Sequence, residues 1–337
     1  MSTVSERPPS LADVARVAGV SPSTASKALN DRTDVKRATK ERVVRIAREL
    51  GYSPNPVARA LSQGPTGTVG VVTSDLEGRF ALPMLMGVED ALGADRVLTF
   101  LCDARGDDMR EARLVQTLLE RRVDGIIIVG RQPDPRPSLG RLSVPVVYAY
   151  SESDDPLDTS ITVDNTDVGR RAAEHLLSLG RTRIAHISGE PDHSASVRRL
   201  EGFQAALDAA SVEMAGPPLF GNWSEGWGRA AMGRALSEAP DLDAVFCASD
   251  QIARGAIDAL HDRGIGIPDQ IAVIGVDNWQ VLAENARVPL STVDLQLKRL
   301  GRVAAARLMA AMAGRPAPGL EQLGSRVCAR QSTIPLR

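Results

Sequence analysis

The sequence is poor in cysteine, in aromatic residues and in long apolar runs, and each shortage excludes a class of protein. Its three cysteines, Cys102, Cys247 and Cys328, lie far apart and lack the paired spacing of a disulfide framework or zinc site. No apolar run approaches the roughly 20 residues of a membrane-spanning helix. The opening MSTVSERPPSLADV has no apolar core like that of a signal peptide. We therefore expect a cytoplasmic protein whose cysteines are small buried hydrophobes.

Catalytic motifs are missing as well. The sequence contains no GxSxG nucleophile turn, no P-loop and no HExxH or paired-cysteine metal motif. No nucleophile and neighbouring base can be assigned from the residues alone. The sequence therefore predicts a protein that is not an enzyme and that needs no cofactor and no metal.

Charge is unevenly distributed along a chain of otherwise ordinary globular composition. The 337 residues are 43% hydrophobic, which suggests two or three domains with ample cores. Residues 1–63 hold eleven basic and six acidic side chains, whereas the remainder holds 29 basic and 36 acidic ones. A basic head on an acidic body indicates a polyanionic partner. A merely solvated charged surface is the alternative.

The head carries the pattern of two short helices joined by a tight turn. Ser10 and Asp13 form a capping-box pattern, and Gly19 ends the first helix. Ser21 then caps a second helix that starts with Pro22, in the stretch GVSPSTASKALN. This is the helix-turn-helix pattern, in which the second helix enters the major groove of DNA. An ordinary helical hairpin is the alternative. A third helix is expected from about residue 38 to residue 50.

The body alternates short Val/Ile runs with helical stretches, which predicts parallel sheets covered on both faces. Ligand sites in such sheets lie beyond the carboxyl ends of the strands. Five side chains follow predicted strands in this way: Asp75, Phe80, Trp223, Asp250 and Asp277. An indole face suits the C–H face of a sugar, and carboxylates suit its hydroxyls. Simple packing of Trp223, or a structural capping role for Asp277, is the alternative.

These motifs together resemble the LacI/GalR family of bacterial transcription regulators. The resemblance lies in DVARVAGVSPSTASKALN and ERVVRIARELGYSPNPVARAL, and it continues through TVGVVTSDL, RRVDGIIIVG, RIAHISG, RLEGFQAAL and VIGVDN. It covers essentially the whole chain in order. It implies an all-α helix-turn-helix domain followed by an α/β, periplasmic-binding-protein-like body of two doubly wound parallel-sheet lobes, between which the chain crosses three times.

The resemblance also implies domain boundaries. The headpiece would take residues 1–54, a hinge helix and linker 55–66, and a ligand-binding and dimerisation domain 67–337. Within that domain, lobe 1 is expected at about 67–163 plus 294–321. Lobe 2 is expected at about 164–293 plus 322–337.

DNA-binding roles follow from matching positions in the family. Pro22, Ser23 and Lys27 match positions that read bases, and Lys27 has two possible targets, a guanine edge or a phosphate. The hinge helix of the family lies in the minor groove, where Leu61 matches the residue that wedges into a base step. The full expected set of DNA-binding residues is Ser21, Pro22, Ser23, Thr24, Ser26, Lys27, Asn30, Asn55, Ala58 and Leu61.

Ligand-binding roles follow in the same manner. Arg199, in RLEGF, and Asp277, in GVDN, match ligand-binding positions, and Trp223 matches an aromatic residue that packs on sugars. His193 lies in a Gly/Pro/Ser-rich loop expected to border the cleft. The expected ligand-binding set is Asp75, Phe80, His193, Arg199, Trp223, Asp250 and Asp277. Where relatives have Asn-Asp this chain has Ser249-Asp250. Two other departures from the family alter the pocket: a tandem aromatic pair is Phe80-Ala81 here, and an arginine upstream of RLEG is Val197. No particular family ligand can therefore be carried over.

The sequence thus predicts a homodimeric DNA-binding regulator, a repressor of carbohydrate uptake or catabolism genes. A sugar effector is expected to release it from a pseudo-palindromic operator. Co-repression by the effector is the alternative within the family. Outside the family, two functions compete with this prediction: a sugar-binding protein for transport and a sugar-modifying enzyme with an accessory head.

Overall fold

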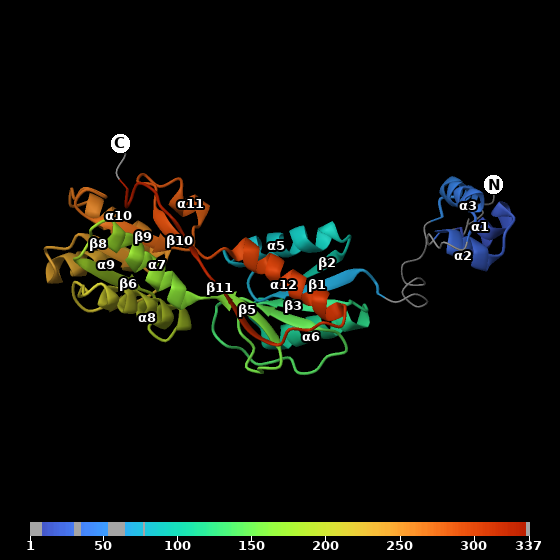
Figure 1. The fold of residues 1–337 in the computed structure, drawn as a ribbon, viewed down its shortest axis with the longest axis horizontal. Helices are drawn as coiled ribbons and strands as arrows, with labels where there is room; N and C mark the ends of the chain where they lie inside the picture. The colour runs from blue at the N-terminus through green and yellow to red at the C-terminus, as the bar shows by residue number, and fades with distance from the viewer. Residues whose placement is uncertain (1–8, 30–34, 53–64, 77, 335–337) are drawn as a thin grey trace, which may run out of the picture. The chain divides into compact units, whose positions relative to one another are not determined.

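A computed structural model describes residues 9–29, 35–52, 65–76 and 78–334. The chain divides into two separately packed units, residues 1–66 and residues 67–337 (Figure 1). None of the helices within the described residues is both long enough and apolar enough to cross a membrane.

The first unit is built from three helices, α1 (Leu11–Ala18), α2 (Pro22–Leu29) and α3 (Arg37–Glu49). The capping box is present, because Ser10 Oγ accepts a hydrogen bond from the Asp13 amide while Asp13 accepts one from the Ser10 amide. Gly19 ends α1 in the left-handed conformation, with φ of 62°. The core consists of small side chains from all three helices, namely Val14, Ala15, Ala18, Ala25, Ala28, Val43, Ile46 and Ala47.

Two details of this unit concern the first and third helices. Val17 of α1 is 50% exposed, because the turn of the helix places Val14 and Ala18 inward instead. The N-cap of α3 is Lys36, whose side chain makes no capping hydrogen bond.

The second unit contains two lobes, each built on a six-stranded sheet. In lobe 1 the strand order is β11-β5-β4-β3-β1-β2 and every pair is parallel. The elements of lobe 1 are β1 (Thr68–Thr73), α5 (Ala81–Ala94), β2 (Leu98–Asp103), α6 (Asp108–Glu120), β3 (Gly125–Val129), β4 (Val146–Ala149), β5 (Thr159–Val163), α12 (Leu297–Met312) and β11 (Gly319–Leu323).

Lobe 2 has the strand order β12-β10-β9-β8-β6-β7, parallel except for the antiparallel pair β10–β12. Its elements are α7 (Asn165–Ser178), β6 (Ile184–Ser188), α8 (Ser194–Ala209), β7 (Leu219–Phe220), α9 (Glu225–Glu238), β8 (Ala244–Cys247), α10 (Asp250–His261), β9 (Ala272–Val276), α11 (Gln280–Ala283), β10 (Ser291–Asp294) and β12 (Arg326–Cys328). The chain passes between the lobes after β5, after β10 and after β11, so the three expected crossings are present.

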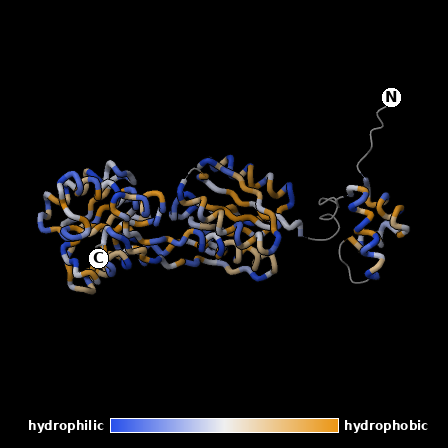
Figure 2. The backbone as a smooth tube through the Cα atoms, turned by 90° about the horizontal axis from the view of Figure 1, so that it is seen from above, coloured by the Kyte–Doolittle hydropathy of each residue, from blue (hydrophilic) through white to orange (hydrophobic). Residues whose placement is uncertain are grey.

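Helices cover both faces of each sheet, which explains the near-continuous Val/Ile runs of the strands. In lobe 1, α5 and α12 pack on one face and α6 on the other. In lobe 2, α7 and α8 pack on one face, and α9 and α10 on the other. Hydrophobic residues accordingly concentrate on the central strands of each lobe (Figure 2). The predicted fold class is confirmed.

Glycines set the spacing of the helix pairs on these faces. A Cβ on Gly87 of α5 would lie 2.0 Å from the Lys298 carbonyl oxygen of α12, and one on Gly301 would lie 2.0 Å from the Met84 carbonyl oxygen. The same reciprocal contact joins α7 to α8 and α9 to α10. Each pair of helices therefore crosses at a distance that a larger side chain would not allow.

Candidate DNA-binding and ligand-binding sites

The α2 helix separates buried alanines from a polar outer side. Ala25 and Ala28 are buried, whereas Pro22, Ser23 and Lys27 are exposed and Thr24 and Ser26 are half-buried. Ser21 accepts a hydrogen bond from the Thr24 amide at 3.1 Å, so its hydroxyl caps the helix. Small, polar side chains of this kind allow a helix to enter a groove about 12 Å wide.

Four of the expected DNA-binding residues lie outside the described residues. They are Asn30, Asn55, Ala58 and Leu61. The hinge helix and its leucine wedge therefore stay predictions.

A cavity of about 250 Å³ lies between the two lobes. It opens at the carboxyl ends of β1, β3, β8 and β9, where parallel sheets place their sites. The structure brings together at this cavity six of the seven residues expected to bind ligand: Asp75, Phe80, His193, Arg199, Trp223 and Asp277.

Asp250 is the exception, because it is completely buried behind the cavity wall. Its carboxylate accepts hydrogen bonds from Thr292 Oγ1 at 2.6 Å and from the Trp279 amide at 2.8 Å. Burial, followed by the negative charge of Asp277, raises the pKa of Asp250 to about 8. The expectation that Asp250 contacts ligand is therefore corrected: its carboxylate fixes the segment that follows β9. Its neighbour Ser249 lines the cavity instead.

Arg199 is the most deeply fixed charge at the cavity. It lies in the first half of α8 and is only 3% exposed, with Nε donating to Asn165 Oδ1 and Nη1 donating to the Ala248 carbonyl oxygen. Burial lowers the pKa of Arg199, and the nearby Asp277 opposes that effect. No described residue accepts a hydrogen bond from Nη2, so this nitrogen is available to a ligand oxygen.

Arg79 was not predicted from the sequence, yet it joins the two lobes at the cavity. From the segment before α5 in lobe 1, its terminal nitrogens donate to Asp277 Oδ2 and to Gln251 Oε1 of lobe 2, both at 2.7 Å. Burial lowers the pKa of Arg79, but the Asp277 carboxylate outweighs burial and the pKa is raised overall. The pair leaves Asp277 Oδ1 and Arg79 Nε buried without partners among the described residues.

Aromatic rings form two further parts of the wall. Trp223 donates from Nε1 to His193 Nδ1 at 2.9 Å, and the two rings stack with centroids 6.0 Å apart. Across the cavity, Phe80 stacks on Tyr150 with centroids 5.4 Å apart. Tyr150 was missed in the sequence, where only its position just after a strand marks it. Its φ of 75° is a strained conformation for a non-glycine residue, of the kind found at functional sites.

The loop after β3 also reaches the cavity and was missed, although the strand-end rule applies to it equally. Arg131, Gln132 and Asp134 line the cavity from this loop. Asp134 Oδ1 accepts a hydrogen bond from the Ser194 amide at the start of α8, at 2.8 Å, which is a second polar contact between the lobes. Three arginines and three aspartates thus face one cavity, so its formal charge is balanced.

The chain was compared with known proteins and structures. Residues 10–55 match the sequence pattern of "Bacterial regulatory proteins, lacI family", and residues 173–333 match the "Periplasmic binding protein-like domain". The HTH-type transcriptional regulator CelR of Thermobifida fusca is 35% identical over 317 residues, which is 91% of this chain and 93% of that protein.

Solved structures agree. The lac repressor dimer bound to operator and the anti-inducer ONPF matches with a TM-score of 0.81 and 26% identity, covering 97% of this chain and 100% of that one. A transcriptional regulator CelR–cellobiose complex matches with a TM-score of 0.63 and 31% identity, covering 96% and 99%. This chain therefore belongs to the lacI family of bacterial regulatory proteins and is a helix-turn-helix transcription regulator.

Proposed function

We propose that this regulator represses carbohydrate uptake or catabolism genes and that a neutral sugar in the interlobe cavity releases it from its operator. The charge-balanced, aromatic-walled cavity carries the proposal. Carboxylates accept hydrogen bonds from sugar hydroxyls, and guanidinium groups donate hydrogen bonds to them. The Trp223 ring suits the C–H face of a sugar. The relative solved with cellobiose supports the same class of effector.

The DNA contacts in this proposal come from α2 and the hinge segment. Ser23 and Lys27 hydrogen-bond base edges or phosphates, and Pro22 offers apolar contact to a base. Thr24, Ser26 and Asn30 hold the DNA backbone. Asn55, Ala58 and Leu61 act in the minor groove, where the leucine bends the duplex.

The operator-bound species in this proposal is a homodimer in the cytoplasm. The edge strand β2 of lobe 1 exposes Leu98, Phe100 and Leu101, and the adjacent α5 exposes Leu82 and Met86. An apolar edge strand of this kind needs a cover. The relative solved on its operator is a dimer, which supports a second copy of this chain as that cover.

We further propose that the cavity binds its ligand without converting it. Among the described lining residues, His193 accepts from Trp223 and has no hydroxyl or thiol nucleophile as a partner. Turnover of a bound sugar by the purified protein would contradict this part of the proposal.

The deciding experiment is a mobility-shift assay on the DNA upstream of the neighbouring genes, with and without sugars selected by thermal shift. We expect a sequence-specific shift that a sugar abolishes. A shift that a sugar strengthens would point to co-repression. The absence of any sequence-specific shift would contradict the proposed binding to an operator.

Two variants assign the proposed roles in the same assay. Asp277→Asn should keep DNA binding but lose the sugar response, whereas Asp241→Asn, at an exposed ion pair, should behave like wild type.

Lys27→Ala should weaken specific binding about tenfold, as expected for loss of a base contact, with little change on non-specific DNA. Equal loss on both DNAs would make Lys27 a phosphate contact. Arg315→Ala controls for the change in net charge.

A further inference from the structure

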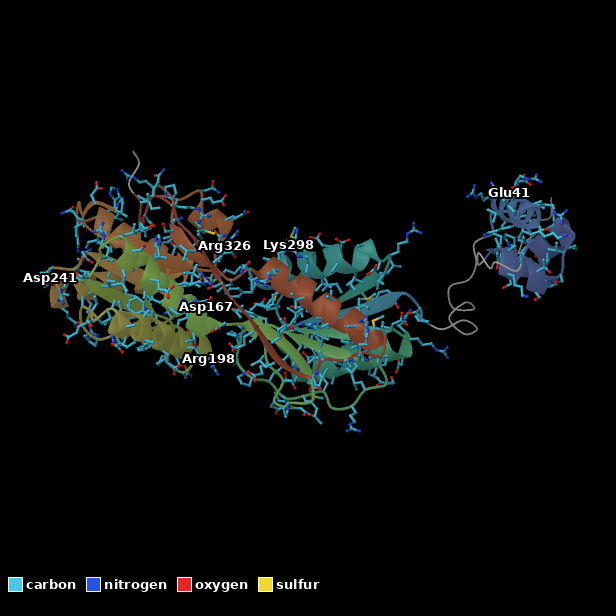
Figure 3. All side chains as sticks on the ribbon, in the orientation of Figure 1. Glu41, Asp167, Arg198, Asp241, Lys298 and Arg326 are labelled. Carbon is cyan, nitrogen blue, oxygen red and sulfur yellow. The ribbon has the colours of Figure 1, made fainter. Side chains whose placement is uncertain are left out.

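A second hollow, of about 640 Å³, lies between the lobes on the other side of the Arg79–Asp277 pair. We call it the basic groove. It is bordered by the start of α5, the segment from Asp277 to Val281, and the start of α12, with Arg326 from β12. Lys298 and Arg326 lie at the facing ends of the two lobes (Figure 3).

The charge of the basic groove differs from that of the ligand cavity. Five basic side chains and two acidic ones line it; the basic ones are Arg79, Lys298, Arg299, Arg302 and Arg326. Asp294 pairs with Arg326, and Asp90, outside the lining, pairs with Lys298 and lies 4.0 Å from Arg302. Arg299 has no ion-pair partner among the described residues, so the groove keeps an excess of positive charge. A concave surface with a net positive charge concentrates anions.

The start of α12 strengthens this preference for anions. The first turn of the 16-residue helix lies at the groove and contains no acidic residue. The N-cap residue Gln296 makes no side-chain hydrogen bond to the helix, so its side chain leaves the first amides of α12 uncapped. The nearby Asp294 carboxylate accepts from the Gln296 amide, at 2.8 Å, which lies before the helix. Helix amides and arginines together favour an oxyanion with several acceptor oxygens.

The basic groove and the ligand cavity share part of one wall. Arg79, Phe80 and Asp277 border both. The Arg79 guanidinium lies 4.5 Å from the centroid of the Phe80 ring and 5.4 Å from that of Trp279. An anion in the groove would compete with Asp277 for Arg79, and any change at Asp277 reaches the ligand cavity directly.

We propose that the basic groove is a second ligand site, for a small molecule that bears phosphate groups. The bound anion draws Arg79 away from Asp277 and so changes the affinity of the cavity for its effector. Linkage makes the effect reciprocal, so the effector also changes the affinity for the anion. This coupling rests on the sugar effector proposed above, whereas anion binding itself does not.

The binding test is calorimetric titration of the full-length protein with inorganic pyrophosphate at constant ionic strength. We expect saturable binding that is weakened about tenfold or more in the double variant Arg299→Gln, Arg326→Gln, because charge-assisted hydrogen bonds are lost. Both side chains are exposed, so folding should be retained. Arg254→Gln with Arg315→Gln is the control for net charge.

Two results would overturn the site: no saturable heat with pyrophosphate, or the same affinity in the groove variant as in the control. Citrate serves as a second probe. If citrate binds as tightly as pyrophosphate, the phosphate class is wrong.

The coupling test repeats a sugar titration with and without saturating pyrophosphate. We expect the sugar affinity of wild type to change about fivefold or more, and that of the groove variant to stay constant. Sugar binding that ignores bound pyrophosphate would overturn the coupling. If no sugar binds while pyrophosphate does, the effector proposal fails and the anion site stands.

Discussion

The two lobes share one architecture but treat the edges of their sheets differently. One edge of the lobe 1 sheet is β2, a six-residue strand that leaves Leu98 69% exposed. The matching edge of the lobe 2 sheet is β7, which has only two residues. Short edge strands resist pairing with other chains, whereas a long apolar edge invites it. At this edge lobe 2 therefore offers little backbone for pairing with another chain, whereas lobe 1 retains an apolar surface suited to a second copy of this chain.

The lobes also supply the ligand cavity differently. Lobe 2 contributes Arg199 from the body of a helix and Asp277 from a strand end, both buried. Lobe 1 contributes Asp75, Arg79 and Arg131 from loops. Arg199 is therefore fixed by contacts within lobe 2, whereas Asp277 is also held by Arg79 of lobe 1.

The largest expected effect is the destabilisation of lobe 2 by a substitution in its aromatic core. Phe246 is completely buried. Its ring stacks on His186 with centroids 4.7 Å apart and packs at a tilt against Phe203 with centroids 5.0 Å apart. Phe246→Ala should cost about 3–5 kcal/mol of unfolding free energy. Hydrogen exchange should then show lost protection in β6 and β8 and retained protection in β1 and β3.

Leu157→Ala is the surface control for this prediction. Leu157 is 70% exposed in lobe 1, so its loss should change the unfolding free energy by less than about 0.5 kcal/mol. Equal loss of protection in both lobes for Phe246→Ala would mean that the lobes unfold as one unit. It would contradict the prediction that lobe 2 opens while lobe 1 stays folded.

Acid should also destabilise lobe 2 before lobe 1, because all four histidines of the chain lie in lobe 2. Burial lowers the pKa of His186 from 6.5 to about 4. Between these two pH values the unfolded chain therefore binds a proton at His186 that the folded chain does not bind. Stability should fall as the pH drops from about 6.5 to about 4, by about 3 kcal/mol for this group.

His186→Phe should remove that part of the pH dependence in urea unfolding measured between these limits. The exposed His261 provides the matched change, His261→Phe, which should retain the pH dependence that His186 causes. His175, whose pKa burial also lowers, remains in both variants. An unchanged slope in His186→Phe would assign the acid sensitivity elsewhere.

The smallest effect on folding is expected at the edge of lobe 1. Phe100→Asp places a charge on an exposed strand, so the unfolding free energy of the monomer should change by less than about 0.5 kcal/mol. Sedimentation should nevertheless show that the dimer dissociates at about tenfold or more higher protein concentration. Leu157→Asp should not change association. Wild-type association in Phe100→Asp would place the dimer contact on another surface.

Local patterns in the sequence were enough to predict the helix-turn-helix and the alternating body. The Ser10–Asp13 box and Gly19 are decided by neighbouring residues, and the Val/Ile runs by burial on two faces. The strand-end rule placed Asp75 and Asp277 at the cavity for the same reason.

What the sequence did not reveal depends on contacts between distant segments. Arg79 meets Asp277 across 198 positions of sequence, and no local pattern marks that pair. Asp250 also follows a strand, but Thr292 and the Trp279 amide turn its carboxylate inward. The strand-end rule therefore selects segments that approach a site, and long-range partners decide which side chains face it.

The two lobes differ in one more respect, which concerns how the protein can be observed. All three tryptophans, Trp223, Trp227 and Trp279, lie in lobe 2, whereas the three tyrosines, Tyr52, Tyr148 and Tyr150, lie in the head and lobe 1. Selective excitation of the indoles therefore reports on lobe 2 alone. Because Trp223 faces the ligand cavity and Trp279 the basic groove, each site has one indole in its lining, and the unlabelled protein can report on both through its summed tryptophan emission.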